Sequence, residues 1–192
     1  FIFENYIHRI VDRARTNLYE IIIVPILGFA ILGNFSLAMQ FVSLAFLGSA
    51  VVFKYTLPDD ARGEKNRRLK FYTIILSISL TIIGIITLPI VLPVFFPEYT
   101  EIVDPIKIII ISVIPLTITN IFMSEYLGNE KSRRILISRL ISLSTFIILT
   151  IVLGSEFGIT GLTVAYLISV TVETICLIPT SKLRNHKKWE IN

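Results

Sequence analysis

The chain has 192 residues, of which 54% are hydrophobic and only 17% are charged. Soluble domains carry about 25% charged residues, and several apolar stretches here approach the roughly 20 residues that cross a hydrocarbon core. The composition therefore excludes an ordinary soluble domain and predicts an all-α integral membrane protein. The formal net charge of +4 bears on orientation in the membrane, and we expect no nucleic acid partner.

The first third of the chain predicts a basic segment followed by two helices. Residues 1–17 carry Arg9, Arg13 and Arg15, with apolar residues at helical spacing. This pattern is typical of an amphipathic helix lying along the membrane, or of the end of a longer helix. Because the first residue is not Met, we expect a fragment whose upstream part is absent.

The apolar stretch 18–53 is too long for one crossing, since a single helix over it would reach about 54 Å. A hydrocarbon core is only about 30 Å thick. We place a turn at the Gly33-Asn34 pair, a turn-favouring dipeptide. The prediction is one helix over about 18–32 and another over about 34–54.

Four more helices are predicted over about 71–96, 103–127, 134–153 and 158–179. Pro89 and Pro93 are expected to bend or break the first of these, and Pro115 lies near the middle of the second. The sequence therefore predicts a six-helix membrane domain over residues 18–180, followed by a basic tail over 181–192.

The distribution of charge supports an even number of crossings. With six helices, all but one of the 18 Lys and Arg residues fall on one side, including the basic stretch Lys54–Lys70. The exception is Lys107. The other side carries Glu98, Glu101, Asp104 and Glu156. By the positive-inside rule, both ends of the chain are predicted to lie in the cytoplasm, with the helices in the cell membrane.

Charged residues within the apolar stretches are candidates for function, because lipid does not solvate them. Glu20, Glu125, Arg139 and Glu173 all lie toward the basic side. Arg139 is expected to pair with Glu173 or with Glu125 inside the bundle. A proton or ion relay is the alternative interpretation.

A semi-polar stripe runs along one face of the second helix. Ser36, Gln40, Ser43 and Lys54 recur at helical spacing. Such a face lines an aqueous cavity, or it makes ordinary hydrogen bonds to neighbouring helices, and both interpretations stay open. Gly161, Ala165 and Ser169 are spaced four residues apart in the last helix, as in closely packed membrane helices.

Nothing in the sequence indicates catalysis. Cys176 is the single cysteine, and the two histidines, His8 and His186, lie near opposite ends of the chain. There is no nucleophile with a matching base, no metal-ligand spacing and no phosphate-binding glycine loop. We expect no catalytic residue, no metal and no cofactor.

Several short motifs, in order, resemble a known family. Pro58 precedes a basic loop, and the longer motifs are LGNFSLAMQF (32–41), FFPEYTEIVDPIKII (95–109), YLGNEKSRR (126–134) and FGITGLTVAYLIS (157–169). Together they resemble the C-terminal half of polysaccharide or lipid-linked oligosaccharide flippases, within the multidrug/oligosaccharidyl-lipid/polysaccharide exporter superfamily. One departure is Glu20 with Leu27-Gly28, where the family often has Asp and then Leu-Gly.

The resemblance implies one lobe of a two-lobe, alternating-access transporter whose N-terminal lobe is missing here. The implied substrate is a glycan linked to a lipid pyrophosphate, and membrane lipids are the other expected partners. Ser36, Gln40 and Ser43 would contact sugar. Lys54, with Arg9, Arg13 and Arg15, would attract the pyrophosphate.

Two other functions remain as alternatives. One is an ion-coupled multidrug antiporter of the same superfamily, which would place acidic residues in its cavity. The other is a six-helix membrane scaffold or partner subunit that transports nothing, and it would have no hydrated face.

Overall fold

The computed structural model describes residues 2–63, 66–128 and 132–178, without the side chains of residues 2–20, 22, 61 and 100. Within these ranges the chain is almost entirely helical and contains no strand. The helices are α1 (Ile2–Ala61), α2 (Arg67–Phe95), α3 (Val103–Ile110), α4 (Val113–Gly128), α5 (Ser132–Leu149) and α6 (Ser155–Leu177). A 3-10 helix, η1 (Pro97–Ile102), precedes α3, and a π-helical segment, η2 (Thr150–Gly154), joins α5 to α6.

Among the residues that the structure describes, four helical stretches are long and apolar enough to cross a membrane, by length and composition. They are Ile23–Asp60, Arg67–Phe95, Val103–Gly128 and Ser132–Leu177. The all-α class and the compatibility with a membrane are therefore confirmed. The stretches differ in number from the predicted helices because α1 is continuous through its bend and because α5, η2 and α6 follow one another without a gap.

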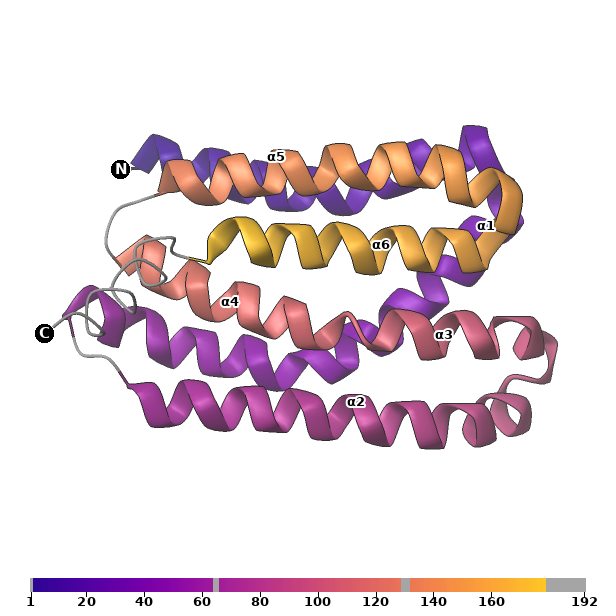
Figure 1. Cartoon of the computed structure of the whole chain (residues 1–192), viewed down its shortest axis with the longest axis horizontal. Helices are drawn as coiled ribbons and strands as arrows, with labels where there is room; N and C mark the ends of the chain where they lie inside the picture. The colour runs from indigo at the N-terminus through magenta and orange to yellow at the C-terminus, as the bar shows by residue number, and fades with distance from the viewer. Residues whose placement is uncertain (1, 64–65, 129–131, 179–192) are drawn as a thin grey trace, which may run out of the picture.

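Gly28 is the point at which α1 changes direction. Its φ of 82° and ψ of 172° are non-helical and lie in a region that essentially only glycine adopts. Figure 1 shows the two arms of α1 running in opposite directions on either side of this bend. The prediction of a turn at Gly33-Asn34 is wrong: both residues are helical, since a glycine with helical angles costs only about 1 kcal/mol. Residues 2–17 belong to the same helix as residues 18–27.

Of the bend or break predicted at Pro89 and Pro93, the break is wrong. α2 is not broken at Pro89 or Pro93 and runs on to Phe95. The break occurs instead before Pro115, where one predicted helix becomes α3 and α4. Pro115 lacks an N–H, and its ring would meet the carbonyl of Ile111, four residues earlier. The Ile111 carbonyl accordingly accepts from Ile114 N, at 3.2 Å, in a tighter turn.

The α5–α6 pair forms an antiparallel hairpin (Figure 1). The chain reverses at the predicted turn, where Gly158 has a φ of 56°. A Cβ on Gly161 would lie 2.0 Å from the Leu153 carbonyl oxygen, so only glycine permits this approach. Farther along, Ser142 Oγ donates a hydrogen bond to Ser169 O at 2.9 Å. The spacing of small residues on α6 thus serves close helix packing.

The exterior of the bundle is more apolar than parts of its interior. On α2 the buried face carries Thr73, Ser77 and Thr81, whereas Ile83 and Ile86 are exposed. Soluble helices bury their most apolar stripe, but helices surrounded by lipid gain nothing from doing so. The arrangement fits a bundle whose outer surface contacts lipid.

Candidate functional site

The two ends of the bundle carry opposite charge. Figure 1 shows that α1, α4 and α6 end, and α2 and α5 begin, at the same end. We call it the basic end, because its described residues include Arg62, Arg67, Arg68, Lys70, Arg133 and Arg134. The opposite end carries Glu98, Glu101, Asp104 and Glu156, and there Lys107 Nζ lies 2.7 Å from Asp104 Oδ1. Lys107, the one basic residue that the described ranges place on the acidic side, is therefore neutralised locally.

The semi-polar stripe of α1 lies on the outside of the bundle. Gln40, Ser43 and Lys54 are exposed and Ser36 is half-buried. Ser43 Oγ donates to Met39 O at 2.8 Å, so its hydroxyl proton is satisfied within the helix. The stripe is thus presented to whatever lies beside α1, rather than to a cavity enclosed by this bundle.

Arg139 and Glu173 meet inside the bundle, between α5 and α6. Arg139 Nε lies 3.7 Å from Glu173 Oε1, and their side chains are only 7% and 1% exposed. Arg139 Nη2 also lies 3.4 Å from Met123 Sδ of α4. Of the two pairings that the sequence allowed, the structure brings together Arg139 and Glu173.

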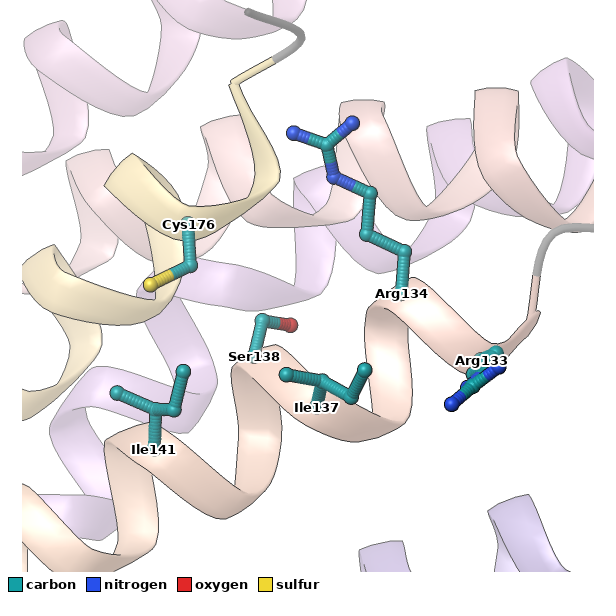
Figure 2. A pocket seen from close by; sticks show the side chains of 6 residues that line it. All are labelled: Arg133, Arg134, Ile137, Ser138, Ile141 and Cys176. Atoms are coloured by element: carbon teal, nitrogen blue, oxygen red, sulfur yellow. The ribbon is translucent and has the colours of Figure 1, made fainter.

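A groove opens between α5 and α6 at the basic end (Figure 2). Its volume is about 510 Å³, and it is lined by Arg133, Arg134, Ile137, Ser138, Ile141 and Cys176. Figure 2 shows the thiol of Cys176 on α6 on the side of Ile141 of α5. Apolar side chains form most of this groove, and two arginines stand at its mouth.

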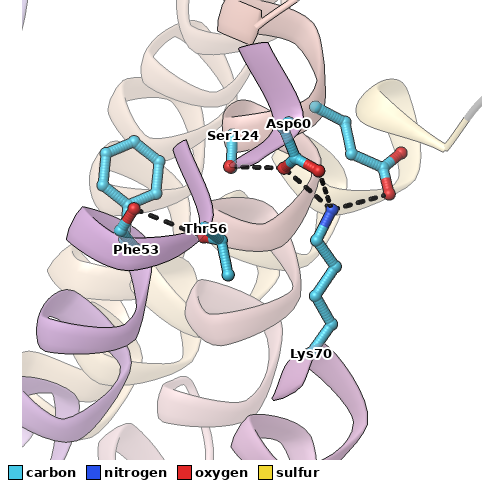
Figure 3. Close-up of polar contacts among 6 residues, drawn as sticks. Phe53, Thr56, Asp60, Lys70 and Ser124 are labelled. Carbon is cyan, nitrogen blue, oxygen red and sulfur yellow. Dashed lines mark hydrogen bonds and ion pairs between the residues drawn. The ribbon is translucent and has the colours of Figure 1, made fainter. Parts of the chain in front are cut away.

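Glu125 takes part in a second charge cluster, which joins α1, α2 and α4 (Figure 3). Lys70 Nζ lies 2.7 and 2.8 Å from the two carboxylate oxygens of Asp60, and 3.1 Å from Glu125 Oε1. Ser124 Oγ donates to Asp60 Oδ2 at 2.6 Å. The side chains of Lys70 and Asp60 are 9% and 3% exposed. The cluster ties three helix ends together and neutralises an ammonium that would otherwise be buried alone.

Sequence reasoning missed Lys70 and Asp60 as partners. The sequence places both in the polar stretch between two helices, because the expected helices end at about 54 and begin at about 71. A usable signal exists on α2, where Lys70, Thr73, Ser77 and Thr81 share one helix face. In a lipid-surrounded helix, a polar stripe of this kind marks the buried face.

Arg9, Arg13, Arg15 and Glu20 lie in the first arm of α1, but their side chains fall outside the described part of the structure. Their roles therefore stay predictions. Among the residues that the structure describes, no group of His, Cys, Asp and Glu is placed to hold a metal ion.

Comparison of the chain with family models, with curated proteins and with solved structures found no match in any of the three. The features of the chain that bear on function are the stripe on α1, the two buried charge clusters and the charge asymmetry of the bundle.

Proposed function

We propose that the chain is one lobe of a two-lobe membrane transporter that moves lipid-linked oligosaccharide or polysaccharide precursors across the cell membrane. The observation that carries this proposal is the exposed stripe of Gln40, Ser43 and Lys54 on α1. Lipid does not satisfy an amide or an ammonium, so such a stripe calls for water or another polar surface beside it.

The length of the stripe suits a path through the membrane. From Ser36 to Lys54 a helix rises about 27 Å, which is close to the roughly 30 Å of a hydrocarbon core. A second lobe facing this stripe would enclose a cavity that water enters from either side in turn. Alternating access between two such lobes is the transport mechanism that we propose.

We infer six crossings from the path of the chain. The bend at Gly28 gives α1 two arms, α2 crosses once, α3 and α4 together cross once, and α5 and α6 cross once each. The basic end would then face the cytoplasm, together with residues 1–17 and 181–192. Lys54 and the nearby basic residues would stand at the cytoplasmic mouth of the cavity.

The chemistry of the stripe fits a glycolipid. Hydroxyl and amide groups of Ser36, Gln40 and Ser43 are suited to hydrogen bonds with sugar hydroxyls. Lys54, with Arg9, Arg13 and Arg15, offers charge-assisted contacts to a pyrophosphate. The exposed apolar residues beside the stripe, such as Leu44 and Leu47, would tolerate the lipid part.

An ion-coupled drug antiporter is the second candidate, and the position of the acids weighs against it. Asp60 and Glu125 contact Lys70, and Glu173 contacts Arg139, all within the bundle. The stripe itself carries no acid to bind a cationic drug or a coupling ion. In a scaffold that transports nothing, a partner surface would cover the stripe and water would not reach it.

Translocation of a fluorescent lipid-pyrophosphate oligosaccharide, measured in proteoliposomes with the full-length protein, tests the proposal. The Gln40→Leu/Lys54→Gln variant should lose about tenfold in rate, since one charge-assisted hydrogen bond is enough for a loss of this size. Thr87→Val is the matched control, because Thr87 is an exposed polar residue on α2, away from the stripe. Unchanged translocation in the double variant would refute the proposal, and export of a cationic drug without glycolipid translocation would favour the antiporter.

A further inference from the structure

We propose that the groove between α5 and α6 binds an anionic phospholipid, with the phosphate at Arg133 and Arg134 and an acyl chain along α5. This inference goes beyond the proposed transport function. It requires that the helices cross a membrane, but it does not require a glycolipid substrate or a second lobe.

The inner part of the groove suits an acyl chain. Ile137 and Ile141 are one helical turn apart on α5, and both are exposed. Ser138 Oγ gives its hydrogen to Ile135 O at 2.8 Å, so its hydroxyl proton is satisfied within the helix. The volume of about 510 Å³ falls in the range of small-molecule sites, which is about 300–1,000 Å³.

Arg134 is held in place at the mouth of the groove. Its Nη2 donates to Ile178 O at 3.1 Å, just beyond the end of α6. Its guanidinium carbon lies 5.2 Å from the centre of the Tyr126 ring. Tyr126 in turn donates its hydroxyl proton to Leu177 O at 3.0 Å. Since the arginine is ordered before a ligand arrives, little side-chain entropy remains to be lost on binding.

The donors that remain favour a phosphate. A guanidinium has five N–H donors, and within the described part of the chain the Arg134 guanidinium gives one of them to Ile178 O. Arg133, the preceding residue of α5, is exposed and lines the same groove, so it adds positive charge there. Planar guanidinium groups bind phosphate oxygens in pairs of hydrogen bonds. The mouth of the groove therefore has donors and positive charge for an anionic headgroup.

Local charge favours an anionic lipid over a zwitterionic one. None of the described residues that line the groove is acidic. The nearest acid along α6, Glu173, is buried and contacts Arg139. In the sequence, further basic residues flank α5 and α6, namely Lys131 before α5 and Lys182, Arg184, Lys187 and Lys188 after α6. Basic pockets between helices on the cytoplasmic side are typical sites for anionic headgroups.

Cys176 provides the measurement, because it is the single cysteine and lines the groove. The full chain is placed in nanodiscs of phosphatidylcholine alone or with added phosphatidylglycerol, and the rate of Cys176 labelling by an uncharged maleimide is followed. Phosphatidylglycerol should slow labelling about tenfold, because two arginines near an anionic surface contribute at least this much binding. Inorganic phosphate in the phosphatidylcholine discs should not protect the thiol, since it leaves the apolar part of the groove empty.

Two matched controls separate a bound lipid from a general surface effect. Arg133→Gln/Arg134→Gln should abolish the protection, whereas Arg67→Gln/Arg68→Gln, which removes two exposed arginines at the same end, should retain it. Ile175→Cys in a Cys176→Ser background places a thiol one residue away, at an exposed position that does not line the groove. Its labelling should respond little to phosphatidylglycerol.

Several results would overturn the lipid site. They are equal labelling of Cys176 with and without phosphatidylglycerol, equal protection of Ile175→Cys, or loss of protection in the Arg67/Arg68 variant alone. Protection by inorganic phosphate would assign the site to a free anion instead. Because Arg133 and Arg134 lie outside the α1 stripe, failure here leaves the glycolipid proposal standing, and the reverse also holds.

Discussion

Lys70 is a buried cation held by two carboxylates at the basic end. Asp60 accepts from its ammonium with both carboxylate oxygens, and Glu125 accepts with one. The cluster formally has one more negative than positive charge, and Ser124 donates a further hydrogen bond to Asp60. A buried pair of this kind adds little stability over apolar packing, but removal of one partner is costly because the other charge remains buried.

We predict that Lys70→Met destabilises the protein by about 3–5 kcal/mol, since Asp60 would stay buried without its counter-charge. Unfolding in detergent micelles, followed by helical circular dichroism, measures the loss. Arg67→Met is the control: Arg67 is exposed on the same helix, so its change should fall within about 0.5 kcal/mol.

The double variant Lys70→Met/Asp60→Asn tests the coupling. It should be less destabilised than the sum of the two single variants, because both charges of the close pair are then removed together. Strict additivity of the single effects would show that the ion pair carries no coupling energy and would contradict the interpretation of the cluster.

The buried charges show where residue-level prediction succeeds and where it stops. Arg139 and Glu173 stand alone in apolar stretches at similar depth, so their pairing was one of two that the sequence predicted. Asp60 and Lys70 border a hydrophilic stretch, where a charge ordinarily remains in water. Their burial depends on α1 continuing to Ala61 and packing against α4, which local sequence does not reveal.

The bend in α1 and the break between α3 and α4 each depend on one backbone position. Gly28 sets the reversal of α1 with a φ of 82°, and Pro115 sets the break between α3 and α4. Because Pro115 has no N–H, the carbonyl of Ile111 loses the donor that a continuous helix would give it. Gly33, Pro89 and Pro93 interrupt no helix, since all three lie within helices.

Exchange of two glycines in α1 tests the position of the bend. Gly28→Ala should destabilise the protein by about 1–3 kcal/mol, because alanine would be strained at a φ of 82° and a ψ of 172°. Gly33→Ala is the control, since a Cβ there would meet nothing within 4 Å and Gly33 is helical. It should be neutral or stabilising by up to about 1 kcal/mol.

Thermal unfolding of both variants in the same detergent measures the difference. If Gly33→Ala were the destabilised variant and Gly28→Ala the neutral one, the bend would lie where the dipeptide Gly33-Asn34 suggested, and the path of α1 described above would be incorrect.

At the scale of the whole molecule, composition and charge count predicted the all-α class and the asymmetry between the two ends. Mean hydropathy and the number of basic residues are properties of whole segments. An error of a few residues in a helix bound therefore changes neither the predicted class nor the predicted side of a loop. Composition and charge count did not predict that the α1 stripe lies on the outside of the bundle. Periodicity shows which residues share a helix face but not what that face contacts. The groove between α5 and α6 likewise depends on how two helix ends meet.

The most direct measurement is the reaction of introduced cysteines with a membrane-impermeant thiol reagent, in a Cys176→Ser background and in native membranes. Gln40→Cys and Ser43→Cys sample the exposed stripe, and Ser36→Cys samples its half-buried start. Ile83→Cys is the matched control: it is exposed on α2 and lies as many residues from Phe95 as Gln40 lies from Gly28. The stripe faces a hydrated cavity if positions 40 and 43 react fast, position 36 more slowly and position 83 hardly at all. Equal and slow reaction at positions 40, 43 and 83 would mean that α1 has no hydrated face, and it would contradict the transporter assignment.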